Sequence, residues 1–402
     1  MKKIFIITLL LILSYILESP AQVWERLSFS EDCRAIAGVD SIFFVGTYYA
    51  GMYYSNNYCE TLIEINEGLK SQNIFSIIIV DTFCFIGTFK GGCYKTSIRN
   101  INWEVANNGL KDLNIIDFMY NDNTLYAATT NGLFISSDLG LNWNLSSNGL
   151  VSYSCRSLAK TDNEIILGTD ENIYISTNNG VNWVPKNNGI DNGVNSIDVN
   201  CLVADNNKIY LGLWNGAGIF ISTNSGEVWN LFRDGLNNYY YISDIIIVEK
   251  EYVVSSMGGG VFFCDYNSNH WNSLNQGLNL DPPFYESIKS LYWDKKYIFS
   301  ASTQGLLRME RSKIQTGVNS KNKSKNILFP NPTSDYIQIN TETIIDKIEI
   351  FDVLGNTRIT HPCIPSQEGS YRFDVSQLQS GIYFCTLKAG EYAETVKMVV
   401  LK

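Results

Sequence analysis

One unit of about 40 residues recurs along most of this 402-residue chain, and it strongly limits the folds that the chain can adopt. The copy at Cys155 to Ile190 contains two short β-type runs, IILGT and IYIST, then a compact STNNGVNW corner and a closing Asn-Gly pair. Six copies align by a corner residue and by a glycine six positions later. The corner residues are Leu62, Trp103, Trp143, Trp183, Trp229 and Trp271, and the glycines are Gly68, Gly109, Gly149, Gly189, Gly235 and Gly277. Repeats of this period with four strand-sized segments predict the blades of a β-propeller.

The two ends of the repeat region indicate how the ring closes. A seventh unit begins at Ile288 but lacks an outer strand, and an isolated matching piece at residues 23–29 places Trp24 at the corner position. This N-terminal strand would complete the last blade and remove an exposed sheet edge. The expected fold is all-β, a seven-bladed β-propeller of four-stranded blades followed by a small β-sandwich. Six or eight blades are the alternatives if a terminal unit is miscounted.

A short polar motif, SxDxGxxW, forms the corner of three units. Its residues are Ser136, Asp138, Gly140 and Trp143, then Ser176, Asn178, Gly180 and Trp183, then Ser222, Asn224, Gly226 and Trp229. Asp or Asn can bond backbone N–H groups of the turn, Gly can take a positive φ, and Trp can pack on the blade. Units 1, 2 and 6 depart from the motif, so we expect looser corners there.

Over roughly residues 23–314 this corner resembles the Asp-box of the BNR, sialidase-like propellers and of the Ycf48-like and Vps10-like repeat families. In those families the corner is structural and lies between the third and fourth strands. The resemblance therefore implies the propeller fold and a structural role for the corner residues, but it says little about activity.

The first 21 residues have the pattern of a signal peptide. Lys2 and Lys3 precede an apolar run from Ile4 to Leu17, and the small residues before Gln22 suit a cleavage site. The apolar run is short for a membrane-spanning helix, which needs about 20 residues. No later segment is both long and apolar, so we expect an exported chain without a transmembrane anchor in its mature form.

Composition argues against several classes of function. The net charge is −10 and the repeats hold no block of Lys or Arg, so nucleic acid is not expected as a partner. With two histidines, no CxxC, no phosphate loop and no nucleophile elbow, we expect no metal and no cofactor. Among the nine cysteines, Cys84 with Cys93 or Cys363 with Cys385 could form disulfides, or all could be buried thiols.

After a Ser/Asn/Lys-rich linker at residues 315–326, the pattern changes to short alternating strands at 327–402. Shared motifs there are Pro330-Asn331-Pro332, then Asp352 followed by Gly355, then Gly381 with Tyr383. This segment resembles the C-terminal sorting domain of the type IX secretion system. The resemblance implies contact with that machinery, passage through a Gram-negative periplasm to the outer-membrane surface or the medium, and removal of the domain. An ordinary accessory sandwich is the alternative.

Propellers usually bind ligands on the face made by the loops between second and third strands and between blades. Candidate residues on this face are Tyr48, Tyr49, Phe89, Lys90, Asp170, Glu171, Trp214 and Tyr240. Aromatic side chains there could stack on sugar rings or anchor a protein, or they could simply pack between loops. We expect a propeller at residues 22–314 that serves as a binding or scaffold module for a glycan or an envelope protein.

Enzymatic functions are less well supported. A sialidase needs three arginines on a carboxylate, and most arginines of the ring flank strands or corners, so that activity is disfavoured. The alternative is a glycoside hydrolase acting on extracellular polysaccharide, which would show two carboxylates about 5–10 Å apart in an acidic cleft. A third possibility is an assembly factor of the Ycf48 type, which predicts a basic patch, and the acidic composition argues mildly against it.

Overall fold

The computed structural model describes residues 24–190, 197–236, 241–266, 268–280, 286–312, 314, 327–329, 333–341, 347–352, 356–362, 369–389 and 392–402. The expected signal peptide and linker lie outside these residues. The chain divides into two compact units, Met1–Gln315 and Thr316–Lys402.

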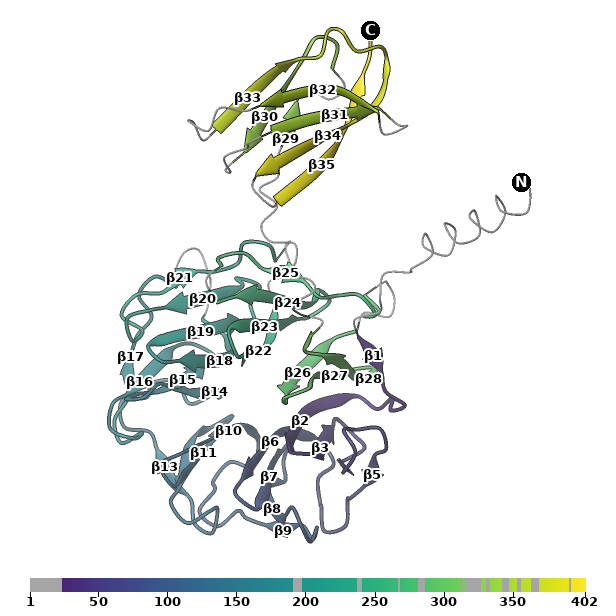
Figure 1. The fold of residues 1–402 in the computed structure, drawn as a ribbon. Coiled ribbons are helices and arrows are strands. Elements are labelled where there is room, and N and C mark those ends of the chain that lie inside the picture. Colours follow the sequence, from purple (N-terminus) through teal and green to yellow (C-terminus); the bar gives the residue numbers. More distant parts are fainter. Residues whose placement is uncertain are drawn as a thin grey trace, which may run out of the picture. The chain divides into compact units, whose positions relative to one another are not determined.

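The first unit contains seven four-stranded antiparallel sheets arranged as blades around a centre (Figure 1). Blade 1 contains β2(Cys33–Val39), β3(Ile42–Thr47), β4(Met52–Ser55) and β5(Ile63–Glu64). Blade 2 contains β6(Ile74–Val80), β7(Phe83–Thr88), β8(Gly92–Ser97) and β9(Glu104–Val105). Blade 3 contains β10(Ile115–Asn121), β11(Thr124–Thr129), β12(Gly132–Ser136) and β13(Asn144–Ser146). Blade 4 contains β14(Cys155–Lys160), β15(Ile165–Thr169), β16(Ile173–Ser176) and β17(Val184–Pro185). Blade 5 contains β18(Val199–Asp205), β19(Lys208–Leu213), β20(Ile219–Ser222) and β21(Asn230–Leu231). Blade 6 contains β22(Ile242–Val248), β23(Glu251–Ser256), β24(Gly260–Asp265) and β25(Asn272–Ser273). The first strand of each blade contacts the first strands of both neighbours, so these seven strands line the centre.

The seventh blade closes the ring with strands from both ends of the repeat region, as predicted. It contains β26(Ile288–Trp293), β27(Tyr297–Ser302), β28(Gly305–Glu310) and the N-terminal β1(Glu25–Arg26), which pairs with β28. Trp24 is fully buried, and its indole Nε1 donates to the Leu274 carbonyl of blade 6 at 2.6 Å. The predicted seven-bladed fold and its closure are therefore confirmed.

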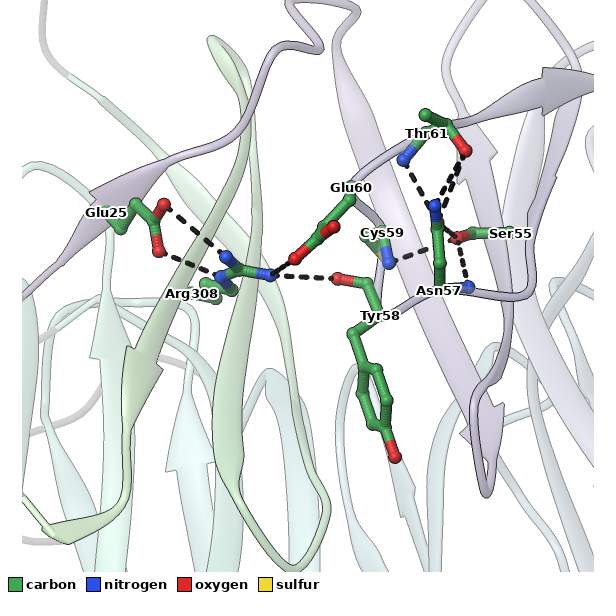
Figure 2. A network of polar contacts seen from close by, with 8 residues as sticks. All are labelled: Glu25, Ser55, Asn57, Tyr58, Cys59, Glu60, Thr61 and Arg308. Carbon is green, nitrogen blue, oxygen red and sulfur yellow. Dashed lines mark hydrogen bonds and ion pairs between the residues drawn. The ribbon is translucent and has the colours of Figure 1, made fainter.

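Arg308 strengthens this closure by joining the N-terminal strand to blade 1 (Figure 2). Its Nε donates to Glu25 of β1 at 2.9 Å, and its Nη1 lies 3.5 Å from Glu60 and 3.4 Å from the Tyr58 carbonyl in the blade 1 corner. The Arg308 side chain is only 11% exposed. Because the guanidinium is fully charged and has several donors, it can satisfy all three acceptors at once.

The corner tryptophans join successive blades. Each is buried and donates its indole N–H to the preceding blade, as Trp143 does to the Ala106 carbonyl at 2.8 Å and Trp229 to the Lys186 carbonyl at 2.8 Å. The closing glycine of each of these units lies against the backbone of the corner tryptophan in the next unit. Gly109 has a φ of +90°, and a Cβ there would lie 2.1 Å from the Trp143 carbonyl oxygen. The closing glycine of one unit thus permits a close approach of the corner tryptophan of the next unit.

The corner motif lies between the third and fourth strands and is held by its own hydrogen bonds. In blade 3, Ser136 Oγ accepts the Gly140 N–H at 2.8 Å, and Asp138 Oδ1 accepts the Asn142 N–H at 2.8 Å. Blade 1 reproduces these bonds with different residues. Ser55 Oγ accepts the Cys59 N–H at 3.1 Å and Asn57 Oδ1 accepts the Thr61 N–H at 3.1 Å (Figure 2). Blade 1 thus keeps both hydrogen bonds of the corner, at longer distances than in blade 3.

The disulfide predicted as one possibility for Cys84 and Cys93 is not formed. Both residues are free, buried thiols, and burial raises the pKa of each well above its ordinary value. Cys385 is likewise a free, buried thiol, and Cys363 lies outside the described residues. These side chains behave as small apolar core residues.

The second unit is a small two-sheet structure, as predicted. One sheet has the order β29(Ile327–Phe329), β30(Tyr336–Thr341) and β33(Gly369–Asp374), and the other β32(Thr357–Pro362), β31(Lys347–Asp352), β34(Gly381–Ala389) and β35(Tyr392–Val400). Its core includes Ile337, Ile350, Leu378 and Tyr383. Of the sorting motif, Asp352 accepts a hydrogen bond from Arg358 and Gly381 begins β34, whereas Pro330, Asn331, Pro332 and Gly355 lie outside the described residues.

A pair of glycine substitutions tests the contact between blades. Gly109→Ala should lower the free energy of unfolding by about 2 kcal/mol more than Gly258→Ala, because overpacking of this kind costs about 1–3 kcal/mol. Gly258 is the matched control, since it has a φ of +73° but a Cβ there would meet nothing within 4 Å. Urea denaturation of both variants measures the difference. Equal losses of unfolding free energy would show that the close approach of Gly109 to Trp143 does not exclude a larger side chain.

Candidate functional site: the central funnel

The centre of the propeller contains a recess of about 440 Å³, lined by residues of all seven first strands and by Trp214. The lining strands are β2, β6, β10, β14, β18, β22 and β26. We call this recess the funnel. Volumes of this size are typical of sites for small ligands.

A β-bulge in every first strand supplies the residues at the funnel's entrance. In each blade the pairing register between first and second strands shifts across one extra residue near the start of the first strand. Bulges re-aim side chains and are common next to binding sites. The seven extra residues, here called the mouth ring, are Arg34, Phe75, Ile116, Arg156, Asn200, Ser243 and Lys289, and all of them line the funnel. They lie at the strand ends that face the turns between second and third strands.

The mouth ring carries three cations and no carboxylate. The Arg34 guanidinium lies 4.1 Å from the centre of the Tyr48 ring, and its Nε is 3.7 Å from Asp32 Oδ1, which is too long for a hydrogen bond. Arg156 Nε is buried without a hydrogen-bond partner. Burial, and then the charge of Arg34, lowers the pKa of Lys289.

One residue further along each first strand, a second set of side chains forms the floor ring. Its members are Ala35, Ser76, Asp117, Ser157, Cys201, Asp244 and Ser290. Asp117 accepts the N–H of Phe118 in its own strand and that of Leu158 in the next blade, both at 2.8 Å. Asp244 does the same with Ile245 at 2.8 Å and Leu291 at 2.7 Å. These carboxylates therefore bridge neighbouring first strands.

Ser157 shows that the bridging role does not require a carboxylate. Its Oγ accepts the Leu202 N–H of the next blade at 3.0 Å, in the same way as Asp117 and Asp244. Burial raises the pKa of Asp117 to about 7 and that of Asp244 to about 6, although the backbone N–H bonds act in the opposite direction. Both carboxyl groups consequently titrate near neutral pH.

Three of the predicted face residues reach the mouth ring. Tyr48 stacks on Arg34, Phe89 lies 5.8 Å from Phe75 between ring centres, and Trp214 lines the funnel directly. The others are more peripheral. Tyr49, Lys90 and Glu171 are exposed, Asp170 accepts a hydrogen bond from Ser152 Oγ at 2.6 Å, and Tyr240 lies outside the described residues.

Apart from Trp214, the residues that line the funnel are absent from the sequence-based candidates. From the sequence, the ring's arginines mostly flank strands or corners, whereas the structure brings Arg34 and Arg156 together with Lys289 in one ring. A signal existed, because the mouth-ring residue precedes the last residue of the second strand by the same interval in every blade. The interval from Arg34 to Thr47 equals that from Lys289 to Ser302. Aligning the units by their corner residues does not reveal this interval, because the loops that lead into the first strands differ in length.

The geometry suits recognition of polar, charged groups. Among the residues that the structure describes, no group of three or more His, Cys, Asp or Glu side chains is placed to hold a metal ion. Asp117 and Asp244 are the only carboxylates among the residues lining the funnel. Each of their four oxygens already accepts a backbone N–H.

The C-terminal unit matches a known family. Residues 327–402 match the secretion system C-terminal sorting domain. This tail is a type IX secretion sorting domain. It directs the protein to the cell surface or the exterior, as predicted. Within the described part of the chain, no helix has the length and apolar character needed to cross a membrane.

Solved structures confirm the propeller fold. YCF48 bound to D1 peptide has 14% sequence identity and a TM-score of 0.56, over 73% of this chain and 98% of that one. The extracellular domain of a B. thetaiotaomicron protein described as a hybrid two-component system has 14% identity and a TM-score of 0.62. That match covers 94% of this chain and 57% of that domain. No curated protein matches the sequence. At these identities the likeness shows the fold alone.

The floor-ring carboxylates predict a pH-dependent stability. An unfolded aspartate titrates near 3.8, so between about pH 4 and 7 the folded protein binds more protons than the unfolded chain. Stability should therefore fall as the pH rises through this window. In the Asp117→Ser variant, which copies Ser157, the fall should be smaller. Chemical denaturation from pH 4 to 8 measures this.

Asp138 provides the control of opposite sign. Hydrogen bonds from Asn142 and Ser136 lower the pKa of Asp138. Asp138 therefore stabilises the folded protein above the pKa of an unfolded aspartate, and this stabilisation is lost as the pH falls below about 4. Asp138→Asn, which copies Asn178, should leave the slope between pH 5 and 8 unchanged. An equal slope in the wild type and in Asp117→Ser would contradict the assignment.

Proposed function

We propose that this protein is a non-catalytic binding module of the cell surface, which takes a glycan or an envelope protein at the mouth of its funnel. The observation that carries the proposal is the mouth ring, because all seven blades direct one bulge residue into a single recess. Trp214 stands beside that recess and is 38% exposed. An aromatic ring that is partly exposed next to polar donors supplies both apolar contact and orientation to a ligand.

The surroundings of the funnel support a docking face. Exposed apolar side chains gather in the loops at this end of the blades, among them Tyr49, Phe89, Tyr153, Trp214 and Tyr241. Aromatic residues are enriched where proteins bind partners, because they bury much area with little loss of conformational entropy. The sorting tail places this face outside the cell, where glycans and envelope proteins are available.

A glycoside hydrolase is the second candidate, and Asp117 and Asp244 are the observation in its favour. They line the funnel and have raised pKa values, as a catalytic acid requires. Their backbone bonds, and the equivalence of Ser157, favour the bridging role instead. If the protein is a hydrolase, sugar fragments should appear with the wild type and disappear with Asp117→Ser.

Trp214→Ala tests the binding proposal. Truncating a central aromatic at a binding site typically costs about 2 kcal/mol or more, so affinity for captured ligands should fall at least about tenfold. The ligands are found by applying the full-length protein to an array of extracellular glycans and to outer-membrane fractions, with mass spectrometry to detect products. Leu231→Ala is the control, because Leu231 is 45% exposed in the same blade but lies on the outer strand β21.

Equal loss in Trp214→Ala and Leu231→Ala would show that the funnel is not the binding site. Release of sugar fragments by the wild type would contradict the binding-module proposal and support the glycoside hydrolase.

A further inference from the structure

We propose that the mouth of the funnel binds an acidic sugar, a uronate unit of an anionic polysaccharide, between Arg34 and Lys289 on one side and Arg156 on the other. This inference rests on the proposed function, because it names the ligand class of the same site.

The placement of the three cations carries the first step. Arg34 and Lys289 lie on β2 and β26, the first strands of the adjacent blades 1 and 7, which contact each other. Arg156 lies on β14 of blade 4, which is across the seven-blade ring from that pair. An anionic group that enters the funnel therefore meets cations from both sides. In a chain of net charge −10, this grouping favours ligands of negative charge at one place.

Nearby carboxylates do not remove this preference. Asp32 lies beside Arg34, and Asp198 interacts with Arg156, but neither lines the recess. Asp117 and Asp244 line it one ring deeper, where each of their oxygens already accepts a backbone N–H. The outer ring of the funnel is thus cationic.

Unpartnered polar atoms give the second, independent step. Arg34 Nε, Arg156 Nε, Ser76 Oγ and Ser243 Oγ are buried without a hydrogen-bond partner in the protein, and all four residues line the funnel. A buried polar group without a partner destabilises the folded protein, because its hydrogen bonds to water are lost and not replaced. Most buried polar groups in native proteins are satisfied. Four of the twelve exceptions among the described residues line this one recess, where a ligand can supply their partners.

The kinds of donor favour a sugar acid over an acidic peptide. A carboxylate is the natural acceptor for two guanidinium groups and an ammonium group. Serine hydroxyls both donate and accept, which matches the hydroxyl groups of a sugar ring. Trp214 adds a flat apolar face at the edge of the recess. A volume of about 440 Å³ admits a chain end or a single unit rather than a folded partner.

Calorimetry with the full-length protein tests the proposal. The ligands are oligogalacturonate, a neutral galactose oligosaccharide of the same length, and oligoglutamate. We expect oligogalacturonate to bind at least about tenfold more tightly than the other two. Arg156→Gln should weaken its binding about ten- to a hundredfold, since a hydrogen bond to a charged group contributes about 1.5–3 kcal/mol. Arg99→Gln removes the same charge from an exposed outer corner and should have no effect.

Each contrary result has a distinct meaning. Equal binding of neutral and acidic oligosaccharides, or unchanged binding in Arg156→Gln with an unchanged melting temperature, overturns the uronate site. Tighter binding of oligoglutamate overturns it in favour of an acidic peptide. In all these cases, a loss of binding in Trp214→Ala would still support the funnel as the binding site. No binding of any of the three ligands overturns the uronate proposal, while the wider glycan and membrane screen decides the proposed function separately.

Discussion

The contact between each corner tryptophan and the preceding blade is the interaction on which the propeller depends. A single four-stranded sheet cannot bury both of its faces, and the tryptophan supplies a large buried surface together with one directed hydrogen bond to the neighbour. Trp24 makes this contact from the N-terminal strand, so the same interaction also closes the ring. Blade 1 has Leu62 at this position instead, and there Arg308 adds charged bonds between β1 and the corner.

This mode of assembly leaves the entrance of the funnel free to vary. The tryptophans and closing glycines join the blades near the corners between third and fourth strands, whereas the bulges lie in the first strands at the centre. Bridging bonds between first strands can come from Asp117, Asp244 or Ser157 without changing the fold. One scaffold can thus hold different mouth-ring residues without a change of fold.

Sorting and the proposed ligand binding belong to different units of the chain. The tail has its own two sheets and core, and its family determines export. The propeller contributes the funnel, whose residues come from all seven blades and therefore exist as a site only in the closed ring. Breaking the closure at Trp24 or Arg308 should thus affect the site as well as stability.

The sequence alone predicted seven blades, with six or eight as the alternatives, and it also predicted the closing strand and the sorting tail. Each of these depends on a local pattern: a period of about 40 residues, a tryptophan six positions before a glycine, and ordered short motifs near the C-terminus. The tertiary structure decided what faces the centre. Arg34, Arg156 and Lys289 are far apart in sequence and look like ordinary surface cations, and only the bulges in β2, β14 and β26 bring them to one recess. It also decided the chemistry of Cys84 and Cys93, since register and burial, which spacing does not give, keep them as thiols.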